Sequence, residues 1–126
     1  MSKRLELRER YIEGWYEMDA GKLLSSVSDD FMFDDPAEPA PATKETLIDY
    51  MASWDRRTKA AGMKDSGADQ WLLTDYTRVD ENGVLTDWAQ WEIIGTPLRG
   101  MELVKTRDDG VFLERICYFT RPGIQS

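Results

Sequence analysis

The chain has 126 residues and a mass of 14.6 kDa, so we expect a single domain over residues 1–126. Its formal charge of −8 would repel a phosphate backbone, which argues against nucleic acid as a partner. The absence of histidine, with only one cysteine, excludes Ser-His and Cys-His nucleophilic sites and metal sites built from imidazole or thiolate. Acid–base chemistry in this chain must therefore use carboxylates, tyrosines or lysines.

The first thirteen residues, MSKRLELRERYIE, carry charges throughout, whereas a signal peptide has an unbroken apolar core. Because no later stretch is apolar enough to span a membrane, we expect a cytoplasmic protein without a membrane partner. The single cysteine, Cys117, lies in an apolar strand-like run, where we expect it to be a small buried hydrophobic residue. We expect no metal and no cofactor, since no recognisable carboxylate loop for calcium is present.

Helical spacing dominates the first half of the chain. Apolar residues on one side predict a helix over residues 3–18, and KLLSSV at 22–27 predicts a short second helix. A proline-rich loop follows, and Thr43 is expected to cap a third helix that runs to Gly62. The apolar residues that define the third helix are Leu47, Ile48, Met51 and Trp54.

The stretch SDDFMFDDPAEPAP, residues 28–41, alternates apolar and polar side chains as a strand does. Phe31, Phe33 and Asp35 should share one face of this strand, and Met32 and Asp34 the other. Proline at position 36 ends the strand. Asp35 is therefore expected at the edge of the apolar region that the two phenylalanines line.

Strand patterns fill the second half, at residues 70–79, 84–94, 101–106 and 111–120, with Asn82-Gly83 as a hairpin turn. Helices followed by consecutive antiparallel strands predict an α+β fold. A curved antiparallel sheet wrapped around the N-terminal helices would enclose an apolar cavity, the usual place for a small-molecule site.

The order of these elements resembles the cone-shaped nuclear transport factor 2-like (cystatin-like) superfamily over essentially the whole chain. Within it, the sequence is most similar to ketosteroid isomerase and the SnoaL-like polyketide cyclases. The similarity rests on RYIE at 10–13, DDFMFDDP at 29–36 and DDGVFLERICYF at 108–119. The resemblance implies cofactor-free isomerisation or cyclisation of a small hydrophobic carbonyl compound through an enolate. The superfamily also contains non-catalytic members, so the fold alone does not give the function.

Carried over residue by residue, the isomerase pattern makes Asp35 the general base and Tyr11 an oxyanion donor. Its second oxyanion donor, a protonated aspartic acid, falls on Glu102, which is one methylene longer. On an apolar face the pKa of Asp35 would rise towards neutrality, as a base that both takes and returns a proton requires. Asp87 is a second candidate pocket acid, because it shares strand parity with Leu85, Ala89 and Trp91.

Large aromatic and apolar side chains are expected to line the pocket and bind the substrate. The expected wall residues are Trp15, Phe31, Phe33, Tyr50, Trp54, Leu85, Ala89, Trp91 and Phe119. Such a wall would exclude water and suit a flat aromatic or polycyclic compound.

Other interpretations of the same residues remain open. Asp35 can cap a backbone amide in its proline turn, Tyr11 can be a core residue, and Glu102 can face solvent. Relatives with a His-Asp pair are disfavoured because histidine is absent, and an epoxide hydrolase would need Asp87 together with Arg99 or Arg115. The main alternative to an enzyme is a non-catalytic small-molecule-binding or dimerisation module.

The segment DWAQWEII at 87–94 places a tryptophan on each face of its strand, Trp88 on one and Trp91 on the other. A strand that is apolar on both faces is covered on both. We therefore expect a homodimer that forms through the outer face of the sheet.

Overall fold

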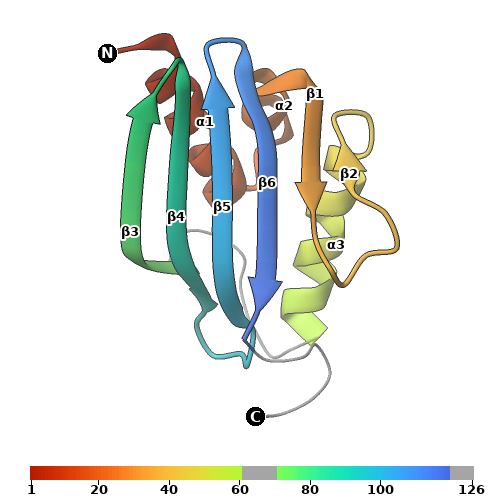
Figure 1. Cartoon of the computed structure of the whole chain (residues 1–126). Helices are drawn as coiled ribbons and strands as arrows, with labels where there is room; N and C mark the ends of the chain where they lie inside the picture. Colours follow the sequence, from red (N-terminus) through yellow and green to blue (C-terminus); the bar gives the residue numbers. More distant parts are fainter. Residues whose placement is uncertain (61–70, 120–126) are drawn as a thin grey trace.

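The computed structural model describes residues 1–60 and 71–119, which form three helices and one six-stranded sheet (Figure 1). The helices are α1 (Lys3–Glu17), α2 (Ala20–Ser26) and α3 (Leu47–Ala60). The strands are β1 (Val27–Asp34), β2 (Ala42–Thr43), β3 (Trp71–Glu81), β4 (Val84–Ile93), β5 (Arg99–Arg107) and β6 (Gly110–Tyr118).

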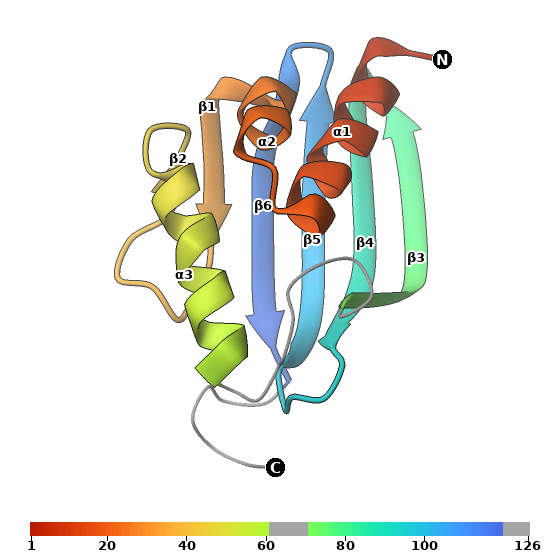
Figure 2. The same cartoon turned by 180° about the vertical axis from the view of Figure 1, so that it is seen from behind.

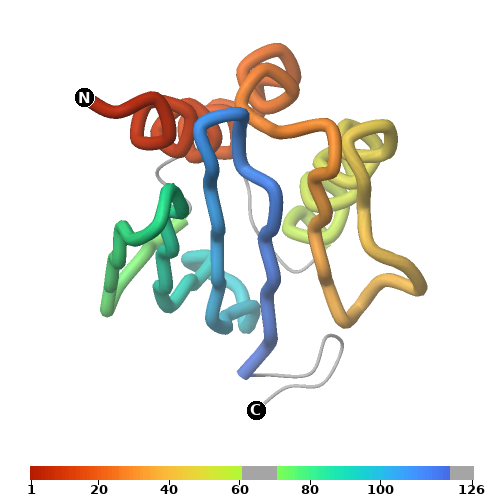
Figure 3. Tube along the Cα trace, turned by 45° about the horizontal axis from the view of Figure 1, so that its top comes forward, coloured from red at the N-terminus to blue at the C-terminus, as the bar shows by residue number. Residues whose placement is uncertain are grey.

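The sheet has the strand order β2-β1-β6-β5-β4-β3, and all three helices lie against one of its faces (Figure 2). In a view tilted toward the top of the molecule, the trace surrounds a central region with the β3–β4 hairpin on one side and α3 on the other (Figure 3). The predicted α+β fold is confirmed. The sheet is mixed, however, because β1 begins beside the β5–β6 turn and runs parallel to β6.

The alternation predicted for the DDFMFDD segment is confirmed. Phe31, Phe33 and Asp35 are buried on the helix-covered side, and Met32 is 44% exposed on the opposite face. The strand extends further back than predicted, to Val27, because that residue already pairs with Val111 at the start of β6.

The Asn82-Gly83 hairpin is also confirmed. Both residues have positive φ, 54° for Asn82 and 76° for Gly83, the conformation that a two-residue turn between twisted strands requires. This turn sets the register of β3 and β4, in which Arg78 pairs with Asp87.

The start of the third helix differs from the prediction. Thr43 is not its cap, because it lies in β2, where it pairs with Met32 of β1. The helix begins at Leu47, and the Thr46 side chain accepts the Thr43 N–H at 2.8 Å. The predicted helix end at Gly62, and the predicted strand ends at 70 and 120, fall outside the described residues.

The end of β6 also differs. Cys117 was expected to be buried, but it is exposed, because its register with Met101 places it on the outer face of the sheet. Phe119 follows the strand and is 53% exposed, so it does not line the interior as predicted. Neighbouring Ile116, with the opposite parity, is buried.

The core fills the space between the helices and the concave face of the sheet. Its largest fully buried side chains include Tyr11, Phe31, Leu23 and Leu47. Among residues 1–60 and 71–119, no helix is long and apolar enough to cross a membrane.

Candidate functional site

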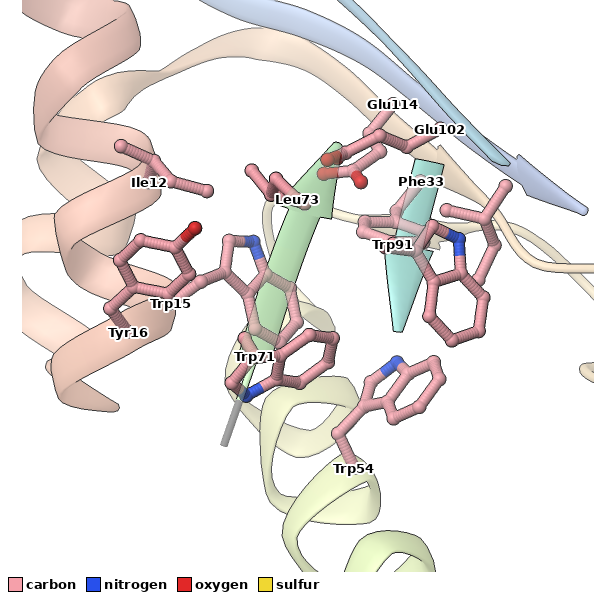
Figure 4. Close-up of a pocket in the computed structure, with 11 residues that line it drawn as sticks. Ile12, Trp15, Tyr16, Phe33, Trp54, Trp71, Leu73, Trp91, Glu102 and Glu114 are labelled. Atoms are coloured by element: carbon pink, nitrogen blue, oxygen red, sulfur yellow. The ribbon is translucent and has the colours of Figure 1, made fainter. Parts of the chain in front are cut away.

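A cavity opens within the aromatic part of this core, between α1, α3 and the concave face of the sheet (Figure 4). Its wall is mostly apolar and includes four of the five tryptophans in the chain. The lining residues are Ile12, Trp15, Tyr16, Phe33, Trp54, Trp71, Leu73, Trp91, Glu102, Glu114 and Ile116. The space open to the centre of a water molecule is about 50 Å³. One water needs roughly 10–15 Å³ by this measure, so the cavity has room for a small chemical group.

Three tryptophans from different elements form one end of the cavity. The Trp54 ring of α3 lies 5.7 Å from Trp71 of β3 and 5.9 Å from Trp91 of β4, centroid to centroid. The rings of Trp54 and Trp91 meet at 87°, an edge-to-face arrangement that aromatic pairs favour. The indole nitrogen of Trp91 donates to the Met101 carbonyl at 3.1 Å, which fixes the ring in the wall.

Gly100 on β5 makes the position of Trp91 possible. A Cβ atom at residue 100 would lie 1.7 Å from the Cys117 carbonyl oxygen and 2.9 Å from the Trp91 ring. Both distances are far inside van der Waals contact. Only glycine therefore allows β5 to pass between its neighbour β6 and the Trp91 ring.

Two acidic side chains enter this apolar cavity from adjacent strands. Glu102 of β5 pairs with Ile116 of β6, and Glu114 of β6 pairs with Val104 of β5, so the two glutamates are diagonal neighbours on the concave face. Glu102 is 8% exposed and Glu114 is 5% exposed. Figure 4 shows both carboxyl groups at the same end of the cavity.

The environment of Glu114 favours its protonated form. Burial raises the pKa of Glu114 well above its ordinary value, and the charge of Glu102 and a hydrogen bond with Glu102 raise it further. A hydrogen bond between two carboxyl groups requires a proton on one of them. Glu114 therefore tends to keep its proton under conditions in which isolated glutamates are ionised.

Tyr11 of α1 is the third member of this cluster. It is 1% exposed, and its hydroxyl donates to Glu114 Oε1 at 2.5 Å. Burial and the adjacent Glu114 raise the pKa of Tyr11 well above its ordinary value, so it remains a donor. In contrast, Glu102 Oε1 is buried and has no hydrogen-bond partner among the described residues. This oxygen is an acceptor left free in the cavity.

Asp35, the expected general base, is not in the wall of this cavity. Its carboxylate accepts hydrogen bonds from the hydroxyls of Tyr50 at 2.7 Å and Tyr118 at 2.9 Å, and from the Arg57 guanidinium at 3.0 Å. The Ala37 amide donates a fourth, at 2.9 Å. Burial and the charge of Asp35 raise the pKa of both tyrosines. Asp35 is thus the centre of a fully bonded cluster that joins β1, α3 and β6.

Asp87, the second candidate pocket acid, also lies elsewhere. It accepts from Arg8 Nε at 2.7 Å and from Arg78 Nε at 2.7 Å. Although burial alone would raise the pKa of Asp87, its hydrogen bond with Arg78 and the charge of Arg8 lower it. The set expected for an epoxide hydrolase is not assembled, because Arg99 and Arg115 are both exposed.

Four of the nine expected wall residues do line the cavity: Trp15, Phe33, Trp54 and Trp91. Four others are buried but pack behind the wall or in another part of the core: Phe31, Tyr50, Leu85 and Ala89. Sequence reasoning missed Glu114 and Trp71. The signal for Glu114 was its parity with Ile116, which places both residues on the concave face.

Comparison with known proteins finds no matching family model and no matching curated protein. Solved structures match over most of the chain. A cystatin-like fold protein from Burkholderia xenovorans LB400 has a TM-score of 0.66 at 12% identity, covering 94% of this chain and 90% of its own. A Parabacteroides distasonis protein, provisionally named a ketosteroid isomerase, has a TM-score of 0.64 at 12% identity, with coverage of 90% and 85%. A Sinorhizobium meliloti protein, provisionally named a polyketide cyclase, has a TM-score of 0.59 at 13% identity, covering 89% of this chain and 94% of its own.

Further structural neighbours from Cytophaga hutchinsonii and Anabaena variabilis are named NTF2-like proteins. The chain therefore has the NTF2-like, or cystatin-like, fold predicted from its sequence. Because the identities are low, these neighbours establish the fold and leave the chemistry to be argued from the site.

Proposed function

We propose that the protein is a cofactor-free acid–base enzyme of the isomerase or cyclase type, with Glu102 as its base. Its substrate would be a small, largely apolar carbonyl compound that reacts through an enolate. The observation that carries this proposal is the Oε1 of Glu102, which is buried in an aromatic cavity without a hydrogen-bond partner among the described residues, beside the buried carboxyl group of Glu114, whose pKa is raised. A buried acid pair of this kind costs stability, and such pairs are common at functional sites.

The proposed reaction uses groups that already line the cavity. The carboxylate of Glu102 takes a proton from the carbon next to the substrate carbonyl, and the electron pair of that C–H bond forms the enolate. The Trp15 indole N–H lines the cavity beside the Tyr11 hydroxyl and meets no acceptor in good hydrogen-bond geometry among the described residues, so we propose that it donates to the enolate oxygen. In a β,γ-unsaturated substrate the enolate is a dienolate, so Glu102 can return the proton to the γ carbon; the double bond then moves into conjugation with the carbonyl, and the isomerisation needs no cofactor.

The structure gives a reason to assign the base to Glu102 and not to Asp35. Asp35 is not among the residues that line the cavity, and its carboxylate already accepts four hydrogen bonds from other described residues. A base must come within hydrogen-bonding reach of the proton it removes. Glu102 lines the cavity, and its Oε1 has no hydrogen-bond partner among the described residues, so it is free to accept a proton from a bound ligand.

The test is a screen of small enolisable ketones and aldehydes for exchange of the α-proton with deuterium in D₂O. In Glu102→Gln we expect exchange to fall by roughly 10²- to 10⁴-fold, the usual contribution of a positioned base. Glu92→Gln is the matched control, because Glu92 is an exposed glutamate on the neighbouring strand β4. If Asp35→Asn abolishes exchange and Glu102→Gln retains it, the base is Asp35 and the assignment fails.

A second candidate function is a non-catalytic small-molecule-binding module. The observation that favours it is that Asp35, which stands at the position of the isomerase base, is fully engaged in structural hydrogen bonds. Such a module would bind an apolar carbonyl compound with the same affinity in wild type and Glu102→Gln, and would exchange no α-protons. Binding without exchange across the screen would favour this candidate.

A further inference from the structure

Indole rings from four different elements surround the cavity. They belong to Trp15 of α1, Trp54 of α3, Trp71 of β3 and Trp91 of β4. The centroids of the Trp71 and Trp91 rings are 6.5 Å apart, and both rings pack against Trp54. Figure 4 shows the four rings around one space, with the carboxyl groups of the two glutamates above them in the view. The aromatic wall therefore comes from the helices and the sheet together.

Two of these rings use their N–H groups outside the cavity. Trp54 Nε1 donates to the Tyr50 hydroxyl at 2.7 Å, and Trp91 Nε1 donates to the Met101 carbonyl at 3.1 Å. Neither Tyr50 nor Met101 lines the cavity. The two rings therefore offer their carbon atoms to a ligand. The π face of an indole carries negative potential and attracts cations more strongly than any other aromatic side chain.

One ring of this wall already binds a cation. The guanidinium carbon of Arg57 lies 4.3 Å from the centre of the Trp54 ring, well within the distance of about 6 Å at which cation–π attraction acts. Arg57 does not line the cavity, and its charge is neutralised by Asp35 and Glu38. Its guanidinium is therefore not the positive partner of the acids in the cavity.

The two glutamates of the cavity wall form no ion pair. In the part of the chain that the structure describes, no ion pair includes Glu102 or Glu114. Arg8, a buried cation of α1, is bound to Asp87 at 2.7 Å. Buried acids are normally paired with a positive group. Because Glu102 is 8% exposed and its Oε1 accepts no hydrogen bond from the described residues, this oxygen is available to a cation that enters the cavity.

We propose that the cavity binds a compact organic ammonium ion, with its methyl groups against the indole rings and its N–H donated to Glu102 Oε1. Cages of aromatic side chains are a general means of binding methylated ammonium groups. The size of the cavity agrees, since about 50 Å³ corresponds to roughly three to five water-sized groups, the size of a nitrogen with its methyl groups. The formal charge of −8 on the chain also favours a cationic over an anionic ligand.

This ligand class applies to an enzyme and to a binding module alike. Only its extension to a substrate rests on the proposed function, and the substrate would then be an α-amino ketone. In such a compound the carbon that loses its proton also carries the ammonium group. Glu102 could therefore accept the N–H of the bound substrate and then reach the adjacent C–H.

The test is a titration of the protein with trimethylammonium chloride and, separately, with tert-butanol, at pH 7 and constant ionic strength. Binding is followed by the NMR signals of the indole N–H groups. Both probes carry three methyl groups and a hydrogen-bond donor, but only trimethylammonium is charged. We expect it to bind about tenfold more tightly than tert-butanol, because cation–π attraction acts on the charged probe alone. Equal affinities for the two probes, or binding of neither, would overturn the inference.

Two variants locate the bound cation. Glu102→Gln and Trp71→Leu should each reduce the advantage of trimethylammonium over tert-butanol several-fold. Trp71 is only partly buried, so its substitution leaves most of the core in place. The matched controls are Glu92→Gln and Trp88→Leu, both exposed on β4, which should leave the two affinities unchanged. An advantage that persists in both Glu102→Gln and Trp71→Leu would place the cation outside the cavity and refute the proposal.

The failure of this inference is distinguishable from that of the proposed function. Selective binding of trimethylammonium without α-proton exchange supports the ligand class and refutes the enzyme. Exchange of neutral ketones that depends on Glu102, without selective binding of trimethylammonium, supports the enzyme and refutes the ligand class.

Discussion

At the scale of single residues, burial explains why the candidate site could be predicted only in part. Asp35 and Glu102 both point to the interior, as strand parity predicts, yet they meet different partners there. Asp35 meets two tyrosine hydroxyls and a guanidinium, whereas Glu102 meets a second acid. Parity gives the face of a side chain, but its partners come from residues distant in sequence, such as Tyr118, which lies 83 positions from Asp35.

The raised pKa of Glu114 predicts a pH dependence of stability. A carboxyl whose pKa is higher in the folded than in the unfolded protein stabilises the fold at low pH. That contribution is lost as the pH rises from the pKa of the unfolded protein, about 4.3, through the higher pKa of the folded protein. Each pKa unit between the two states changes the free energy of unfolding by about 1.4 kcal/mol. Glu114→Gln cannot ionise and keeps both hydrogen bonds. In urea unfolding, the variant should therefore gain stability relative to wild type as the pH increases from about 4 to about 8.

The control for this prediction is Glu92→Gln, which removes the same charge from an exposed position on β4. Its free energy of unfolding should differ from wild type by a similar small amount at all pH values. Parallel pH profiles for wild type and Glu114→Gln would show that Glu114 is ionised in the folded protein.

Substitution of Asp35 should affect stability more than activity. Asp35→Asn removes the charge that Arg57 neutralises. It also turns one acceptor oxygen into an NH₂ donor, which would face either the Ala37 amide and the Tyr118 hydroxyl or the Arg57 guanidinium and the Tyr50 hydroxyl. We expect a loss of about 1–3 kcal/mol in the free energy of unfolding, the cost of an unsatisfied buried group. Chemical denaturation measures it, with Asp34→Asn as control, since Asp34 forms an exposed ion pair with Arg115. A loss no larger than that of Asp34→Asn would contradict the structural role.

At the scale of elements, periodicity predicted α1, α2 and β4 to within a few residues, because these segments alternate cleanly between buried and exposed faces. The two-residue β2 was missed, since it is a strand only through its pairing with β1. The parallel pairing of β1 with β6 was missed for the same reason. Such contacts depend on the arrangement of the whole chain, and local pattern does not encode them.

The buried ion pair between α1 and β4 makes a further prediction. Asp87→Leu should lower the free energy of unfolding by about 3–5 kcal/mol, because Arg8 is left as a buried charge without its partner. The double variant Arg8→Met/Asp87→Leu should recover most of this loss, since an apolar pair replaces the ions. Both values come from thermal or urea unfolding. If the two single losses simply add in the double variant, Arg8 and Asp87 are not coupled.

At the scale of the whole molecule, the sheet has one face covered by helices and one face open. Several large apolar residues lie exposed on or beside the open face: Met32, Leu72, Val79, Trp88 and Ile94. Trp88 is 46% exposed, whereas Trp91, three residues later, is 4% exposed. The predicted two-faced character of β4 is thus confirmed, and the outer face remains the surface on which we propose that a second copy packs.

The homodimer is tested by light scattering at micromolar concentration. Wild type should have the mass of a dimer, near twice 14.6 kDa. Trp88→Glu should be a folded monomer, because it places a charge on the outer face of β4, where we propose that a second copy packs. Thr86→Glu, closer to the end of β4, tests whether any added charge has this effect. A monomeric wild type would remove the proposal.

The central claim is that Glu114 holds a proton in an apolar cavity, next to the buried carboxyl group of Glu102. Infrared spectroscopy measures this most directly, because a protonated carboxyl has a C=O band that a carboxylate lacks. At pH 7 we predict one such band in the wild type and in Glu92→Gln, and its loss in Glu114→Gln. A wild-type spectrum at pH 7 without any protonated carboxyl would contradict the account of the site.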